Sequence, residues 1–143
     1  MNYLEIKGDL FTASEDRMIA HCISSDFALG AGVAKEINKR FDTKFNLFLQ
    51  YNPEKGQDFT GQCLVTDRIL NLVTKYKCYH KPTYDSLKSA LLDMRDYLEE
   101  NDIKKIAMPK IGCGLDKLDW EIVRPMIFEV FKTTDIDIEV YCL

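Results

Sequence analysis

The sequence predicts a single α/β domain spanning residues 1–143, with helices on both sides of a mixed central sheet in a three-layer arrangement. Three observations carry this prediction. Short apolar runs typical of buried strands alternate with amphipathic stretches at helical spacing. Their order along the chain is β, β, α, α, β, β, α, β, α, β. No repeat and no linker-like stretch divides the chain.

Composition narrows the class of protein. The hydrophobic fraction is 46% and the net charge is −4, with no Lys/Arg run longer than a pair, so stable binding along a nucleic-acid backbone is not expected. No apolar run reaches membrane-spanning length and no signal peptide is recognised, so we expect an intracellular protein, cytoplasmic or nuclear. The cysteines are odd in number and form no C-x-x-C pair, which favours reduced thiols and gives no sign of a metal site or cofactor (Cys22, Cys63, Cys78, Cys113, Cys142).

The first third of the chain predicts two strands and a helix. Tyr3–Lys7 alternates between apolar and polar residues, as a half-exposed strand does, and Arg17–Ser24 holds a continuous apolar core that suits a strand covered on both faces. Gly30 and Gly32 come after this strand and lie directly before an amphipathic helix over Val33–Phe41. A glycine-rich loop therefore joins a buried strand to a helix.

The middle of the chain predicts a short helix, two strands and the longest helix. Phe45–Tyr51 is helical, and Gln62–Asp67 and Ile69–Thr74 are strand-like, forming either a hairpin or one strand with a bulge. Thr83 is a natural N-cap for a helix of more than four turns. Its apolar stripe is spaced by three and four residues (Leu87, Ala90, Leu91, Met94, Leu98).

The last third predicts strand, helix and strand. Ile103–Met108 is apolar and is stopped by a proline, and Asp119 is a plausible N-cap for a helix that starts at Trp120. Pro125 falls inside that helical pattern, so we expect a kink or a later helix start. Asp135–Leu143 alternates as a strand with one wet face near a sheet edge.

A second glycine loop follows the strand at Ile103–Met108. It contains Gly112-Cys113-Gly114 and then Asp116, ahead of the helix at Trp120. Two glycine loops that each join a buried strand to a helix favour a phosphate or nucleotide site, because backbone amides and helix N-termini bind anions. The alternative is that both are tight connectors whose glycines serve only turn geometry.

Lys81 stands just before the helix that Thr83 caps. A lysine at the positive end of a helix is electrostatically awkward. It is either a solvated surface lysine or a catalytic lysine whose ammonium form is disfavoured there, so that the neutral amine is more accessible.

Several separated motifs resemble macrodomains, the ADP-ribose-binding α/β/α modules. They are Gly8-Asp9-Leu10-Phe11, Gly30-Ala31-Gly32-Val33-Ala34 and Ile111-Gly112-Cys113-Gly114-Leu115-Asp116. Common macrodomains carry Asn-Ala-x-Asn after the second strand, where this chain has His21-Cys22-Ile23-Ser24. That substitution, together with His80-Lys81-Pro82-Thr83-Tyr84 and Met108–Asp116, resembles the terminal ADP-ribose protein glycohydrolase branch.

The resemblance implies a role for individual residues. Asp9 would accept a hydrogen bond from the adenine amino group, with Leu10 beside it. Lys81 would be the catalytic nucleophile and Asp116 its acid/base partner, whereas His21 would be a hydrogen-bonded core residue. The remaining residues implied to contact ADP-ribose are those that line the diphosphate and distal ribose (Ser24, Gly30, Ala31, Gly32, Val33, Ile111, Gly112, Cys113, Gly114, Leu115).

The activity implied by the resemblance is removal of ADP-ribose from glutamate and aspartate esters of proteins, and deacylation of O-acetyl-ADP-ribose, by a lysine-dependent enzyme that needs no cofactor. Two alternatives stay open. One is a non-catalytic reader that only binds ADP-ribose, and the other is an antitoxin-like hydrolase of ADP-ribosylated DNA bases. A single macrodomain of this size is expected to be a monomer without membrane association.

Overall fold

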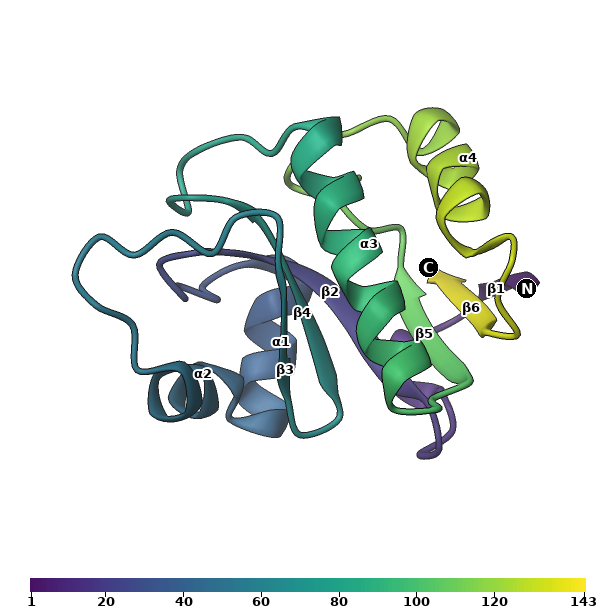
Figure 1. The fold of residues 1–143 in the computed structure, drawn as a ribbon, viewed down its shortest axis with the longest axis horizontal. Coiled ribbons are helices and arrows are strands. Elements are labelled where there is room, and N and C mark those ends of the chain that lie inside the picture. The colour runs from purple at the N-terminus through teal and green to yellow at the C-terminus, as the bar shows by residue number, and fades with distance from the viewer.

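A six-stranded mixed sheet forms the centre of the protein, with the strands in the order β1-β6-β5-β2-β4-β3 (Figure 1). The computed structural model describes all residues, 1–143. The strands are β1 (Asn2–Lys7), β2 (Met18–Ser24), β3 (Cys63–Thr66), β4 (Ile69–Lys75), β5 (Lys105–Pro109) and β6 (Asp137–Cys142). The α-helices are α1 (Gly32–Phe41), α2 (Thr43–Tyr51), α3 (Tyr84–Glu100) and α4 (Trp120–Phe131), and a short 3-10 helix covers Leu10–Thr12.

Five of the six strands run parallel, and this gathers their connecting loops. β1, β6, β5, β2 and β4 pair in parallel, while β3 pairs antiparallel with β4. The carboxyl ends of parallel strands meet at one edge of a sheet, where open α/β sheets bind ligands. The loops that follow β2, β4 and β5 therefore come together there.

Helices cover both faces of the sheet, as predicted. α3 and α4 lie side by side on one face, and the largest apolar cluster fills the space beneath them, with Leu91, Met94 and Val123 at 0% exposure. α1 and α2 lie on the other face (Figure 1) over two smaller clusters that include Ile37 and Leu47. The three-layer α/β/α arrangement is confirmed. None of the helices combines the length and the apolar character needed to cross a membrane.

Local signals in the sequence explain the helix boundaries. The Thr83 hydroxyl accepts a hydrogen bond from Ser86 N–H, and the Ser86 hydroxyl accepts one from Thr83 N–H, so a capping box opens α3. The Asp119 carboxylate accepts from Glu121 N–H at the start of α4. Both predicted caps are confirmed. The two predicted strands in the middle of the chain form a hairpin, β3–β4, rather than one bulged strand.

The expectation for Pro125 was wrong in one respect, because α4 starts at Trp120 and continues through the proline. Pro125 lacks the N–H that would bond to the carbonyl of Glu121. Both residues are on the exposed side of α4, where water can satisfy that carbonyl. The buried stripe on the opposite side keeps the helix on the sheet (Trp120, Val123, Ile127, Val130, Phe131).

Candidate functional site

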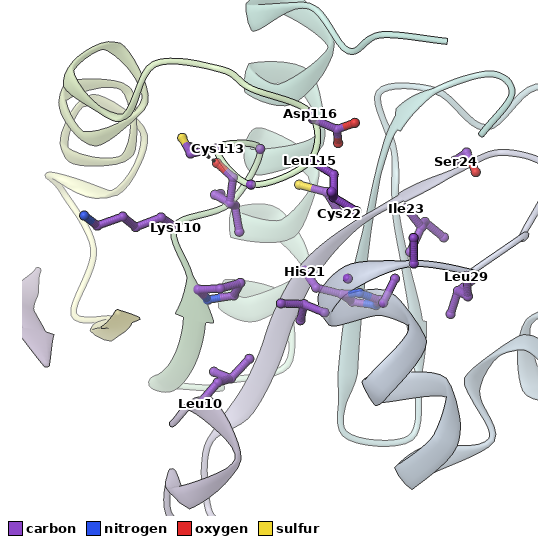
Figure 2. A pocket seen from close by; sticks show the side chains of 18 of the residues that line it. Leu10, His21, Cys22, Ile23, Ser24, Leu29, Lys110, Cys113, Leu115 and Asp116 are labelled. Carbon is purple, nitrogen blue, oxygen red and sulfur yellow. Dashed lines mark hydrogen bonds between the residues drawn. The ribbon is translucent and has the colours of Figure 1, made fainter. Parts of the chain in front are cut away.

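A cavity of about 1050 Å³ opens at the carboxyl ends of the parallel strands, as expected for this topology (Figure 2). Every site residue named from the sequence lines it, and the wall contains all of the two glycine loops (Asp9, Leu10, Ser24, Gly30, Ala31, Gly32, Val33, Lys81, Ile111, Gly112, Cys113, Gly114, Leu115, Asp116). The sequence motifs, far apart in the chain, therefore surround one space.

The first glycine loop presents the N-terminus of α1 to the cavity. Ala31 is the N-cap and has no side chain to satisfy the free amides of the first turn. The first α-helical hydrogen bond runs from Lys35 N–H to the Ala31 carbonyl at 3.3 Å, so the amides before Lys35 are open to an anion. The side chains of Phe27 and Leu29 are buried and anchor this loop. Their backbone φ angles are 56° and 43°, values that cost free energy for residues other than glycine. Such strain is a feature of binding loops.

The second glycine loop closes over the cavity from the other side. Gly112 has a φ of 73°, and its carbonyl accepts a hydrogen bond from Leu118 N–H at 2.8 Å. The loop reaches across to the first one at Leu115. A methyl group added to Gly32 would lie 3.2 Å from the Leu115 Cδ1 atom. The two loops thus approach each other closely enough to enclose an elongated anionic ligand between their amides.

An ion pair lies at one end of the cavity. Lys75 Nζ donates to Asp116 Oδ1 at 2.7 Å, and the two side chains are only 14% and 17% exposed. Figure 2 shows the Asp116 carboxylate above the second glycine loop, on the side of the cavity that also holds Ser24. A lysine and a carboxylate in direct contact inside a ligand cavity can exchange a proton. The neutral lysine amine can then attack a carbonyl carbon of the ligand.

The lysine in this pair is not the one expected. Asp116 was expected to partner Lys81, but the structure pairs it with Lys75. Lys81 lines the cavity and is exposed, as its position before α3 suggests. Lys75 was not identified as a site residue from the sequence. The available signal was its place as the last residue of a buried parallel strand, the position from which such sheets present functional groups.

His21 is a core residue, as the sequence indicated, although it lines the floor of the cavity. Its Nε2 lies 2.5 Å from Asn71 Oδ1, and the Asn71 amide nitrogen donates to the carbonyl of Leu64 and the hydroxyl of Thr66. The Asn71 oxygen is therefore the acceptor and His21 carries its proton on Nε2. Burial lowers the pKa of His21 to about 4, so its ring is neutral at physiological pH.

Two cysteines in the cavity wall are poor nucleophiles. Burial, with the nearby Asp116 charge as the next cause, raises the pKa of Cys22 to about 12. Burial and then the Asp119 charge raise the pKa of Cys113 to about 11. Both thiols stay protonated at neutral pH, so neither Cys22 nor Cys113 is suited to act as a nucleophile.

The sequence is similar to those of known proteins. The profile of the Macro domain family matches residues 20–127. ADP-ribose glycohydrolase OARD1 of Homo sapiens is 42% identical over 142 residues, which are 96% of this chain and 90% of that protein. A DNA ADP-ribosyl glycohydrolase of Thermus aquaticus is 24% identical over 145 residues, covering 95% of this chain and 40% of that protein.

Solved structures share the fold over the whole chain. The macrodomain of Thermus aquaticus DarG superposes with a TM-score of 0.85 at 23% identity, covering 99% of this chain and 98% of the other. Thermosipho africanus DarTG, solved in complex with ADP-ribose, gives a TM-score of 0.79 at 20% identity and covers 98% of this chain and 41% of the other.

Proposed function

The chain belongs to the Macro domain family, and on that premise we propose that it is an ADP-ribose glycohydrolase acting on esters between ADP-ribose and carboxylic acids. The substrates would be glutamate and aspartate esters on proteins, and O-acetyl-ADP-ribose. The observation that carries the proposal is the Lys75–Asp116 pair at 2.7 Å inside the cavity, since a protein that only binds the ligand has no use for it. The 42% identity to an ADP-ribose glycohydrolase supports the same reading.

The proposed ligand lies along the cavity from Asp9 to Asp116. Asp9 Oδ1 accepts from Phe11 N–H at 2.9 Å, so the second carboxylate oxygen is free for the adenine amino group, with Leu10 as an apolar neighbour. The diphosphate would lie between the amides of Gly30–Val33 and those of Ile111–Leu115. The distal ribose would then extend toward Ser24 and the Lys75–Asp116 pair.

Lys75 is the proposed nucleophile, in place of Lys81. An ester on the distal ribose migrates between neighbouring hydroxyls, which frees the anomeric carbon to open to an aldehyde. Lys75 gives a proton to Asp116 and its amine forms a bond to the aldehyde carbon. The carbonyl oxygen departs as water with a proton returned by Asp116, which leaves a protonated imine on Lys75.

The imine makes the next carbon acidic. Asp116 removes a proton from that carbon. The electron pair left on this carbon forms a double bond to the following sugar carbon, which carries the ester. The carboxylate leaves that second carbon with the electron pair of the broken C–O bond. One water then adds at that carbon and a second hydrolyses the imine, freeing Lys75 and ADP-ribose. The net reaction consumes one water per ester.

Two other functions would use the same cavity. A reader would bind ADP-ribose without turnover, but it would gain nothing from a buried lysine–carboxylate pair, whose desolvation is costly. A hydrolase of ADP-ribosylated DNA bases would share the ADP-ribose contacts. The net charge of −4 weighs against a long nucleic-acid strand as the main substrate, although a short single strand could reach the cavity.

The test is release of ADP-ribose from a peptide modified on one glutamate, measured for the wild type, Lys75→Ala and Lys81→Ala, with calorimetric titration of ADP-ribose alongside. We expect release by the wild type and by Lys81→Ala, loss of at least 100-fold in Lys75→Ala, and ADP-ribose binding by all three. Binding without release by the wild type would favour the reader. Loss in Lys81→Ala alone would return the catalytic role to Lys81.

A further inference from the structure

The turn between β4 and α3 presents a run of exposed residues to the cavity. Cys78, Tyr79, His80 and Lys81 are all exposed and all line the cavity that holds Lys75 and Asp116. Pro82 is the one buried residue of the turn, and it lies next to the N-cap of α3. Hydrogen bonds hold the exposed part of the turn, which favours a role in presenting groups to the cavity.

Three hydrogen bonds define this turn. His80 N–H donates to the Lys77 carbonyl at 3.0 Å, and Lys77 N–H donates to His80 Nδ1 at 3.1 Å. The third, from Cys78 N–H to Asp26 Oδ2 at 2.9 Å, fastens the turn to the loop that follows β2. Burial alone would favour the protonated form of Asp26, but the donors around it lower its pKa overall, which keeps this anchor charged.

The same contacts set the orientation and the proton of His80. A backbone N–H can only donate, so Nδ1 is the acceptor and the neutral ring carries its proton on Nε2. Aromatic contacts hold the ring on two sides. Tyr76 lies at 6.1 Å between centroids with planes 29° apart, and Tyr79 lies edge-on at 4.8 Å. Because Nδ1 faces the backbone of the turn, Nε2–H points away from the turn and is free to donate.

We propose that His80 Nε2–H donates a hydrogen bond to the carboxylate that leaves when the ester is cleaved. This inference rests on the proposed hydrolase function and names the residue that handles the acyl side of the substrate. Lys75 and Asp116 act on the sugar carbons, whereas no other pre-oriented side-chain donor has been assigned to the acyl group. His80 lines the same cavity and is exposed, and an acyl group attached to a protein must also lie where the cavity opens to solvent.

The chemical effect follows from where charge develops. When the sugar C–O bond breaks, its electron pair moves to the acyl oxygen, and no proton is needed because the product is a carboxylate. A donor that is already oriented stabilises this charge more than it stabilises the neutral ester, so it lowers the barrier. His80 keeps its proton throughout, and only the strength of its hydrogen bond changes.

Two variants separate this role from the structural role of the ring. His80→Asn keeps an acceptor near the position of Nδ1 for Lys77 N–H but has no group at Nε2. His80→Gln places an amide nitrogen nearer the position of Nε2. We expect kcat/KM on acetyl-ADP-ribose to fall about 10-fold or more in His80→Asn and less in His80→Gln, with ADP-ribose affinity unchanged in both.

The decisive readout is the dependence on the leaving group. Acetyl-ADP-ribose and chloroacetyl-ADP-ribose differ in the stability of the departing carboxylate, so the donor matters less for the chloroacetyl ester. The loss in His80→Asn should therefore shrink on the chloroacetyl ester. Equal losses on both esters, or no loss on either, would overturn the proposal for His80. Failure of the wild type to cleave either ester would instead overturn the proposed hydrolase function.

Discussion

Lys75 Nζ lies 2.7 Å from Asp116 Oδ1, although the two residues are 41 positions apart in the chain. Lys75 ends β4 and Asp116 belongs to the loop that follows β5, so the parallel sheet brings them together at its carboxyl edge. Both side chains are more than four-fifths buried. Substitution of either residue would leave the other as a buried charge without its counter-ion. Variants of Lys75 and of Asp116 therefore both test the role of the pair.

Asp116→Ala should slow turnover without preventing attack by Lys75. The amine still forms the imine, especially at alkaline pH, but nothing removes the proton from the adjacent carbon, so the covalent intermediate should accumulate. Intact-mass spectrometry after mixing with the glutamate-linked substrate should show a larger adduct fraction than in the wild type. Fast turnover with no adduct would remove Asp116 from the reaction.

Gly32→Ala should weaken ADP-ribose binding. Gly32 has a φ of 59°, where a residue with a Cβ costs about 1–2 kcal/mol, and the new methyl group would lie 3.2 Å from Leu115 Cδ1. The backbone strain and this contact would disturb the first loop beside the proposed diphosphate site. Calorimetry should show at least a tenfold rise in Kd. Thermal unfolding of the same variant is the control, because a small change there would show that the effect is local to the loop.

Asp9→Asn tests the adenine contact. An asparagine oxygen can still accept from Phe11 N–H, so the 3-10 helix keeps its cap. The free carboxylate oxygen becomes an NH₂ group, which cannot accept from the adenine amino group. We expect ADP-ribose to bind about tenfold more weakly, with little change in thermal unfolding. Unchanged affinity would move the adenine elsewhere.

His21 should make folding stability depend on pH. Its pKa falls from 6.5 in the unfolded chain to about 4 in the folded protein, because burial disfavours the charged ring. Between these values the unfolded state binds more protons, so stability is lost as pH falls from about 6.5 and the loss levels off near 4. The total is about 3 kcal/mol from this group.

Urea unfolding at several pH values checks that expectation. His21→Leu should be less stable at neutral pH, because Asn71 loses its partner, but should show a flatter profile between pH 6.5 and 4.5. Subtracting the two profiles removes the contribution of the acidic residues. Parallel profiles would show that His21 is not the group responsible.

The elements of the fold could be predicted because they depend on local patterns. Periodicity located the strands, and side-chain chemistry located the caps at Thr83 and Asp119. The glycine loops could be assigned to one site because both follow parallel strands. Pro125 was harder, since its effect depends on which side of α4 faces solvent, and only packing decides that.

The choice between Lys75 and Lys81 could not be made from spacing. Both flank the same turn, and which one meets Asp116 depends on how β4 is paired with β2. The register shifts between Ile23 and Ser24, so that Ser24 lies opposite Lys75 at the cavity edge. That shift is a property of the assembled sheet. The resemblance located the motifs, and the structure shows that Lys75 is the lysine paired with Asp116.

Lys75 is tested most directly by identifying the residue that forms the covalent intermediate. The wild type and Asp116→Ala would be mixed with the glutamate-linked substrate, reduced with borohydride to trap the imine, digested and mapped by tandem mass spectrometry. We expect an ADP-ribose-derived adduct on Lys75 and none on Lys81. An adduct on Lys81, or release of ADP-ribose with no trapped lysine at all, would contradict this expectation.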